Sequence, residues 1–154
     1  MINNDVIRSL RYILNVNELR LVEIAKLGGA QVSESQMSCY LKEEGEPGFE
    51  SCPQNLMARL LNGLIVFKRG KDESKPPLTI DLPTNNVVMK KLRVAFELKD
   101  EEILSMLDSV GLSMTKSELS ALFRKEGHPN YRDCGDQLLR NFLKSLANRE
   151  KSRR

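Results

Sequence analysis

Few side chains in this sequence have the type and spacing that catalysis needs, and the best candidates surround one histidine. His128 is the only histidine, and Glu126 and Asp133 stand close to it along the chain. A histidine beside carboxylates can act as a general acid or base. The sequence is also repeated internally, as described below, and the matching position holds Glu46. We therefore expect His128 to be an exposed turn residue, and a small enzyme is the least favoured function.

The three cysteines are the remaining candidates for a nucleophile or a metal ligand. Cys39, Cys52 and Cys134 form an odd set without a short CxxC spacing, which is typical of a reducing compartment. A nucleophilic thiol needs a partner base, and one histidine with three scattered cysteines makes a poor tetrahedral metal site. The sequence predicts no catalytic residues, no cofactor, no metal and no disulfide.

The chain matches itself without a gap at a shift of 82 residues. Asn3-Asn4 corresponds to Asn85-Asn86, and Gly29 corresponds to Gly111. A repeat of this kind sets the architecture before any local pattern is considered. The shared residues are mostly of the kind that a fold needs.

Each half shows four segments with apolar residues at helical spacing. Asn3 or Asn4 is the expected N-cap of the first helix, and Ser33 and Thr115 are expected to cap the third helix of each half. Pro53 is expected in the first turn of the fourth helix. The third helix of the first half is expected to run through Leu41 and stop at Gly45. The apolar segments are 6–14, 19–27, 37–41 and 56–67, and then 88–96, 103–107, 119–123 and 138–146.

The sequence therefore predicts an all-α protein of two tandem, quasi-equivalent four-helix units. The expected domains are a first helical repeat over 1–69, a linker over 70–84, a second repeat over 85–150 and a basic tail over 151–154. One unit alone has a marginal core, and apolar residues lie off the main helix stripes. We therefore expect the two units to pack together, with a pseudo-twofold axis as one arrangement.

A turn motif occurs once in each half, and we interpret it as structural. Glycine ends a helix in a left-handed conformation, and proline prevents the helix from resuming. The aromatic residue is expected to plug the core, and the cysteine to be buried. The motif residues are Gly45, Pro47, Phe49 and Cys52, and then Gly127, Pro129, Tyr131 and Cys134.

Positive charge is concentrated in the second half. Residues 1–69 hold eight basic and eight acidic side chains, whereas residues 85–154 hold fourteen and ten. This weak excess makes nucleic-acid binding an alternative function, although nucleic-acid-binding domains usually carry a stronger basic footprint. The candidate contacts are Lys116, Arg124, Lys125, Arg132, Arg140, Lys144 and Arg149.

Two runs of sequence, together with the repeated Glu-Gly-X-Pro turn, resemble the YehS-like family of duplicated bacterial proteins. The runs are 3–12 (NDVIRSLRY after the first Asn) and 62–70 (NGLIVFKRG), and the resemblance extends from about residue 3 to residue 149. It implies two all-helical copies in a cytoplasmic bacterial protein. The family is classed as a domain of unknown function, so the resemblance implies no catalytic residues.

The function we expect is a non-catalytic binding or regulatory module. No apolar run approaches the ~20 residues of a membrane span, and the N-terminus does not read as a signal peptide, so a cytoplasmic protein is expected. A protein partner is favoured over nucleic acid, and a groove between the two units is the expected binding surface.

Overall fold

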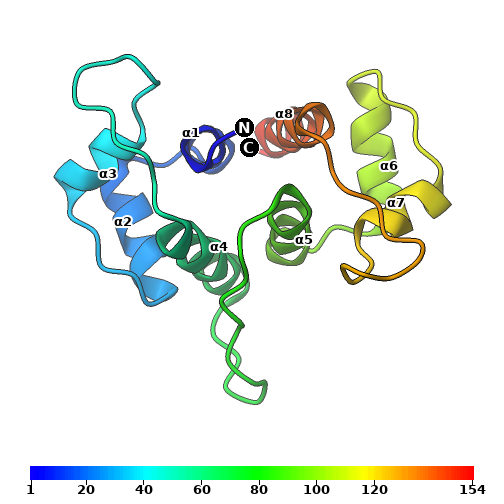
Figure 1. Ribbon diagram of the computed structural model, residues 1–154, viewed down its shortest axis with the longest axis horizontal. Helices are drawn as coiled ribbons and strands as arrows, with labels where there is room; N and C mark the ends of the chain where they lie inside the picture. The colour runs from blue at the N-terminus through cyan, green and yellow to red at the C-terminus, as the bar shows by residue number, and fades with distance from the viewer. The chain divides into compact units, whose positions relative to one another are not determined.

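The computed structural model describes residues 1–154 and contains eight helices and no strand (Figure 1), which confirms the all-α class. The chain divides into two compact units, Met1–Pro83 and Thr84–Arg154. None of the helices is long and apolar enough to cross a bilayer. The first unit contains α1 (Asn3–Leu14), α2 (Glu18–Leu27), α3 (Glu34–Tyr40) and α4 (Gln54–Arg69). The second contains α5 (Asn85–Ala95), α6 (Asp100–Ser109), α7 (Lys116–Leu122) and α8 (Asp136–Ser152).

Both units have the same element order in the same register. Each helix of the second unit starts 82 residues after its counterpart, as Asn85 follows Asn3 and Asp136 follows Gln54. In each unit the second helix packs on the third and the fourth. The sequence repeat is therefore a structural repeat at the level of individual helix starts.

Most of the helix caps predicted from the sequence are confirmed, and one prediction was wrong. Ser33 and Thr115 each accept a hydrogen bond from the third amide of the following helix, at 3.1 Å in both cases. The N-cap of α1 is Ile2 instead of Asn3 or Asn4. Both asparagines lie inside the helix, where their side chains are free to bind other segments.

Two helix ends also differ from the expectation. Pro53 stands one residue before α4, at the N-cap, where it removes no helical hydrogen bond. The third helix ends at Tyr40, before the expected end near Gly45. The third helix of the second unit ends at the equivalent residue, Leu122, so the early end is a property of the repeat.

Each unit has its own apolar core, built from the inward faces of all four helices. The fully buried side chains of the first unit include Ile7, Leu10, Met37, Met57 and Leu61. Those of the second unit include Met89, Leu92, Leu107, Leu119 and Phe142. Burial of these large side chains supplies the main stabilisation of the fold.

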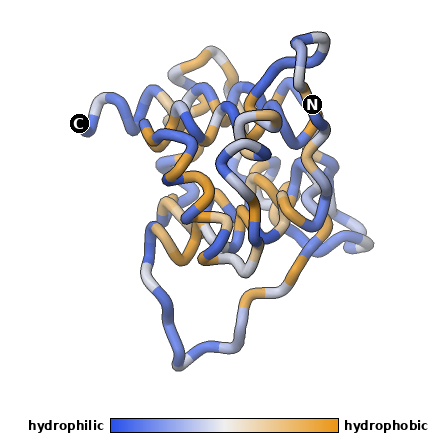
Figure 2. Tube along the Cα trace, turned by 90° about the vertical axis from the view of Figure 1, so that its left-hand side faces the viewer, coloured by the Kyte–Doolittle hydropathy of each residue, from blue (hydrophilic) through white to orange (hydrophobic).

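The segment expected as a linker contains no helix, and residues 70–83 are grouped with the first unit. Asn62 of α4 donates to the carbonyl of Thr79 at 2.9 Å, which attaches the C-terminal part of this segment to α4. Figure 2 shows hydrophilic residues at the tip of the loop and hydrophobic residues on one limb.

Candidate binding groove of the second unit

A groove of about 640 Å³ lies between α6 and α8 within the second unit. Small polar side chains make up much of its wall, with Met106 as an apolar residue at its base and charged groups from both helices. The lining residues are Glu101, Glu102, Ser105, Met106, Ser109, Ser145, Asn148, Arg149 and Ser152.

The groove exists because α6 and α8 lack the glycines that bring their counterparts together. In the first unit, a Cβ atom at Gly63 would lie 1.9 Å from the carbonyl oxygen of Ile24, and one at Gly28 would lie 1.7 Å from that of Arg59. Only glycine permits so close an approach of two backbones. The second unit has Ser145 in place of Gly63 and Val110 in place of Gly28, and α6 packs less closely on α8 than α2 does on α4.

One end of the groove is held by an ion pair between the two helices. A guanidinium nitrogen of Arg149 lies 2.9 Å from the Glu102 carboxylate, and the other nitrogen lies 2.9 Å from Glu150. The pKa of Glu102 is lowered, first by the backbone amide of Lys99 and then by Arg149. Glu102 is therefore ionised at neutral pH and fixed in position.

Other polar groups of the groove remain available to a ligand. Ser105 and Asn148 are exposed, and neither side chain has a hydrogen-bond partner within the chain. Glu101 lies 3.6 Å from the ammonium of Lys116, but its side chain remains 74% exposed. An asparagine amide both donates and accepts hydrogen bonds, so it can pair with a peptide group.

The matching face of the first unit has exposed apolar residues beside charged ones. Leu19, Leu27 and Phe67 are 49%, 50% and 37% exposed, where the second unit has Glu101, Ser109 and Arg149. The guanidinium of Arg20 lies 5.8 Å from the ring centroid of Phe67. The same two positions therefore hold a cation–π contact in one unit and the Glu102–Arg149 ion pair in the other.

The predicted basic contacts are distributed over several elements of the second unit. Lys116 starts α7, Arg140, Lys144 and Arg149 lie on α8, and Arg124, Lys125 and Arg132 belong to the segment between these helices. Three of the seven pair with acids: Lys116 with Glu101, Arg132 with Glu118 at 3.5 Å, and Arg149 with Glu102 and Glu150. Arg140 and Lys144 are exposed, one turn apart on α8.

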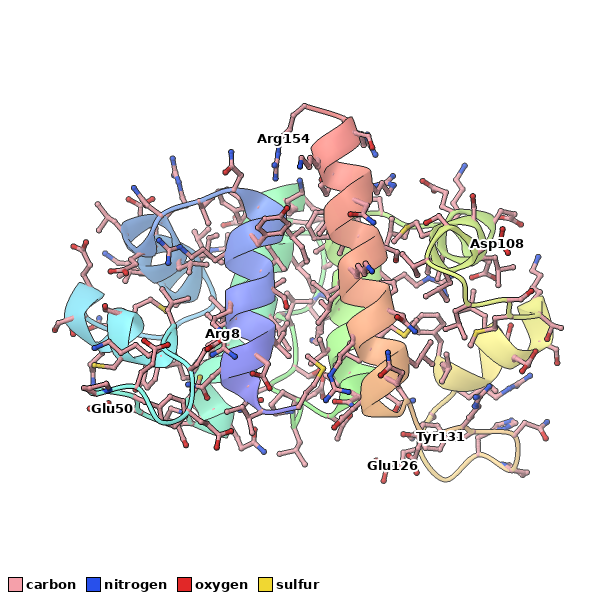
Figure 3. All side chains as sticks on the ribbon, turned by 90° about the horizontal axis from the view of Figure 1, so that it is seen from above. Arg8, Glu50, Asp108, Glu126, Tyr131 and Arg154 are labelled. Carbon is pink, nitrogen blue, oxygen red and sulfur yellow. The ribbon has the colours of Figure 1, made fainter.

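The repeated turn has the same backbone hydrogen bonds in both units. Gly45 and Gly127 both adopt positive φ, at 89° and 92°. The aromatic residues do not plug the core as expected, because Phe49 and Tyr131 are only half-buried. Tyr131 and Glu126 both lie on this turn in the second unit (Figure 3).

Two asparagines that sequence reasoning treated only as helix caps fix this turn to the rest of each unit. Asn4 donates to the carbonyls of Tyr40 and Glu50 at 3.0 and 2.7 Å and accepts from the amide of Cys52 at 3.0 Å. Asn86 makes the three equivalent bonds at 3.0, 2.8 and 2.8 Å. The sequence signal for this role is that asparagine stands at the same position in both halves.

The residues first considered for chemistry are placed apart from the groove. His128 is exposed on the turn, where its Nδ1 accepts from the amide of Asn130 at 3.0 Å. All three cysteines are free thiols. Burial raises the pKa of Cys52 to about 12 and that of Cys134 to about 11, so neither forms a thiolate at neutral pH. No cluster of three or more potential metal ligands is present.

The groove residues were missed because no local motif marks them. A comparison of the halves shows that these positions changed between the copies, since Gly63 aligns with Ser145 and Phe67 with Arg149. It does not show that the changed positions line a groove.

Comparison with known proteins also finds the chain to be duplicated. The sequence is 45% identical over 151 residues to "Uncharacterized protein YehS" of Escherichia coli (strain K12), and the match covers 97% of each chain. No solved structure matches it. The family described as "Protein of unknown function (DUF1456)" matches twice, over residues 3–70 and 85–151. With both copies matched, the chain belongs to the DUF1456 family.

Proposed function

We propose that this protein is a non-catalytic binding module that holds an extended segment of another protein in the α6/α8 groove. The observation that carries the proposal is the groove itself, which Ser145 and Val110 open in one unit while Gly63 and Gly28 close the other. The proposed binding surface therefore lies inside the second unit, with the lining residues named above.

The groove chemistry favours a polypeptide with a basic side chain. Ser105 and Asn148 offer unpaired hydrogen-bonding groups to a peptide backbone. Glu101, whose side chain is 74% exposed and lies 3.6 Å from Lys116, can offer its carboxylate to a lysine or arginine of the partner. Glu102 is already paired with Arg149 at 2.9 Å, so Glu101 is the acidic group that attracts a basic side chain and repels a phosphate at this surface.

The test compares variants that block the groove with a matched control. Ser105→Arg and Ser109→Arg fill the groove, whereas Ser117→Arg makes the same change on an exposed face of α7. Nuclease-treated pull-downs with the unmodified protein should capture a partner that Ser117→Arg also captures and that both groove variants lose. A peptide from that partner should bind the purified protein, and Glu101→Lys should weaken it at least about tenfold.

Two results would contradict this function. One is a partner that the Ser105→Arg and Ser109→Arg variants retain as well as the unmodified protein does. The other is a partner that is released when nucleic acid is digested.

Nucleic-acid binding is the second candidate, and one observation favours it. Arg140 and Lys144 are exposed one helical turn apart on α8; Lys144 has no ion-pair partner within the chain, whereas the charge of Arg140 contributes to the lowered pKa of Asp136. Two cations at this spacing suit contacts with neighbouring phosphates.

A further inference from the structure

The repeated turn carries opposite charge in the two units. Residues 42–51 hold four glutamates and one lysine, whereas residues 124–133 hold three arginines and lysines, one histidine and two acidic residues. We call the first of these segments the acidic turn and the second the basic turn. The equivalent positions at which a glutamate is replaced by a basic side chain or an imidazole are Glu43 and Lys125, Glu46 and His128, and Glu50 and Arg132.

The fold accepts either charge at these positions. Both turns have a glycine at positive φ, and both are fixed by the same three asparagine hydrogen bonds. The exchanged side chains are exposed in both units, where Glu50 and Glu126 mark the two turns in Figure 3. Because the backbone is kept while the charge is inverted, these charges serve no common folding role and are available for recognition.

Charged groups on both turns have no ion-pair partner within the chain. Lys42, the one lysine of the acidic turn, donates to the carbonyl of Pro47 at 2.8 Å, whereas Glu50 forms no ion pair. On the basic turn, Arg124 and Lys125 are exposed and form no ion pair either. Each turn therefore presents one predominant sign of charge to an external partner.

We propose that the acidic turn of one copy of this chain binds the basic turn of a second copy. The charge complement of each turn is present in the same sequence, at equivalent positions of an equivalent backbone, so a second copy supplies it. Phe49 and Tyr131 hold the same place in the two turns and are half-buried, and their exposed parts add an apolar contact beside the charges. In a twofold pair of chains the contact forms twice, so two surfaces that are weak alone act together.

A polyanion such as nucleic acid is a poorer partner for these surfaces. The basic turn itself contains Glu126 and Asp133, whose carboxylates repel phosphate groups. Nucleic acid would also leave the acidic turn without a partner. A second copy satisfies both turns with the residues that this chain already has.

The test exchanges the charges of the two turns, using side chains that the fold already holds at these positions. The acidic variant carries Lys125→Glu, His128→Glu and Arg132→Glu, and the basic variant carries Glu43→Lys, Glu46→His and Glu50→Arg. Sedimentation velocity at low salt should show self-association of the unmodified full-length protein and at least about tenfold weaker self-association of each variant. An equimolar mixture of the two variants should associate again, because one supplies acidic turns and the other basic turns.

Two controls separate this effect from changes in net charge or folding. A variant with Lys26→Glu and Lys90→Glu, both exposed and outside the turns, should associate as the unmodified protein does. Circular dichroism should show unchanged helicity in all variants. Added salt should weaken the association of the unmodified protein, which does not depend on the folding of any variant.

An unmodified protein that is monomeric at low salt and high concentration would overturn the inference. Variants that self-associate as strongly as the unmodified protein, or a mixture of the two that stays dissociated, would do the same. Association that disappears on nuclease treatment would assign the basic turn to nucleic acid instead. The proposed groove is tested separately, because none of the exchanged residues lines it.

Discussion

Asn4 and Asn86 show how a single side chain can organise a loop that has no regular structure. Each amide bridges the end of the third helix and the chain just before the fourth, through three hydrogen bonds. Asn3 and Asn85 extend this contact, by donating to Gln54 at 2.7 Å and to Asp136 at 2.8 Å. Two asparagines in each unit thus attach its first helix to the repeated turn and to the start of the fourth helix.

We predict that Asn4→Ala lowers the free energy of unfolding by about 2–3 kcal/mol, because three hydrogen bonds are lost and buried backbone groups remain unpaired. Asn86→Ala should cost less, since Asn86 is half-buried and water can replace part of its contacts. Urea denaturation measures both, with the exposed Asn148→Ala as the control that changes stability by less than about 0.5 kcal/mol. Equal effects for all three variants would contradict the role assigned to these amides.

The cysteines should differ in reactivity according to their burial. Cys39 is half-buried, whereas Cys52 and Cys134 are each only 6% exposed. In the native protein at neutral pH, we predict that iodoacetamide modifies Cys39 first, as detected by peptide mass spectrometry. Modification of Cys134 at the rate of Cys39 would show that the thiol is not protected as the structure indicates.

The raised thiol pKa values also have a consequence for stability. The folded pKa values of about 12 and about 11 lie above the ordinary value of 9.0, so unfolding releases protons between these limits. Stability contributed by the two buried thiols is present below pH 9.0 and is lost as pH rises through the folded pKa values.

Among the elements, the helix pair α2/α4 differs from α6/α8 because glycines at positions 28 and 63 allow the closer approach in the first unit. Gly63 lies against the backbone of α2, and Ser145 takes its place on α8. The Ser145 hydroxyl donates to the carbonyl of Phe142 at 2.8 Å, so this buried polar group is satisfied within its own helix. The serine can therefore hold the helices apart without the penalty of an unpaired group.

We predict that Gly63→Ala destabilises the protein by about 1–3 kcal/mol, because the added methyl group overlaps the carbonyl of Ile24 and forces α2 and α4 apart. Ser145→Ala is the matched change in the second unit and should have a small effect, since the groove tolerates a side chain there. Thermal and urea denaturation measure both. If the Gly63→Ala protein were as stable as the unmodified one, the close approach of the two helices would not be required.

At the scale of the whole molecule, the sequence predicts that the two units stabilise each other, and this stays a prediction. Fragments 1–83 and 84–154 should each unfold at lower denaturant concentration than the intact chain, because a core of this size is marginal alone. Circular dichroism of the separate fragments and of their mixture measures the effect. Two monomeric fragments that unfold cooperatively at the midpoint of the intact chain would contradict it.

Salt dependence distinguishes the alternative nucleic-acid function. If the intact protein binds DNA or RNA through Arg140 and Lys144, affinity should fall with salt at a log–log slope of about −0.9 per phosphate contact on duplex DNA. Arg140→Ala combined with Lys144→Ala should then reduce the slope by about two. Fluorescence anisotropy with mixed DNA and RNA at low salt measures this, and absence of binding there removes the candidate.

The eight helices, their repeat at 82 residues and most of their caps could be predicted from the sequence, because these depend on local periodicity and on short-range hydrogen bonds. The sequence could not assign the roles of Asn4 and Asn86, whose partners stand 36 to 48 residues away along the chain. The sequence could not identify the groove either. The effect of glycine at position 63 and serine at position 145 depends on the distance between the backbones of the two packed helices, and only the tertiary packing sets that distance.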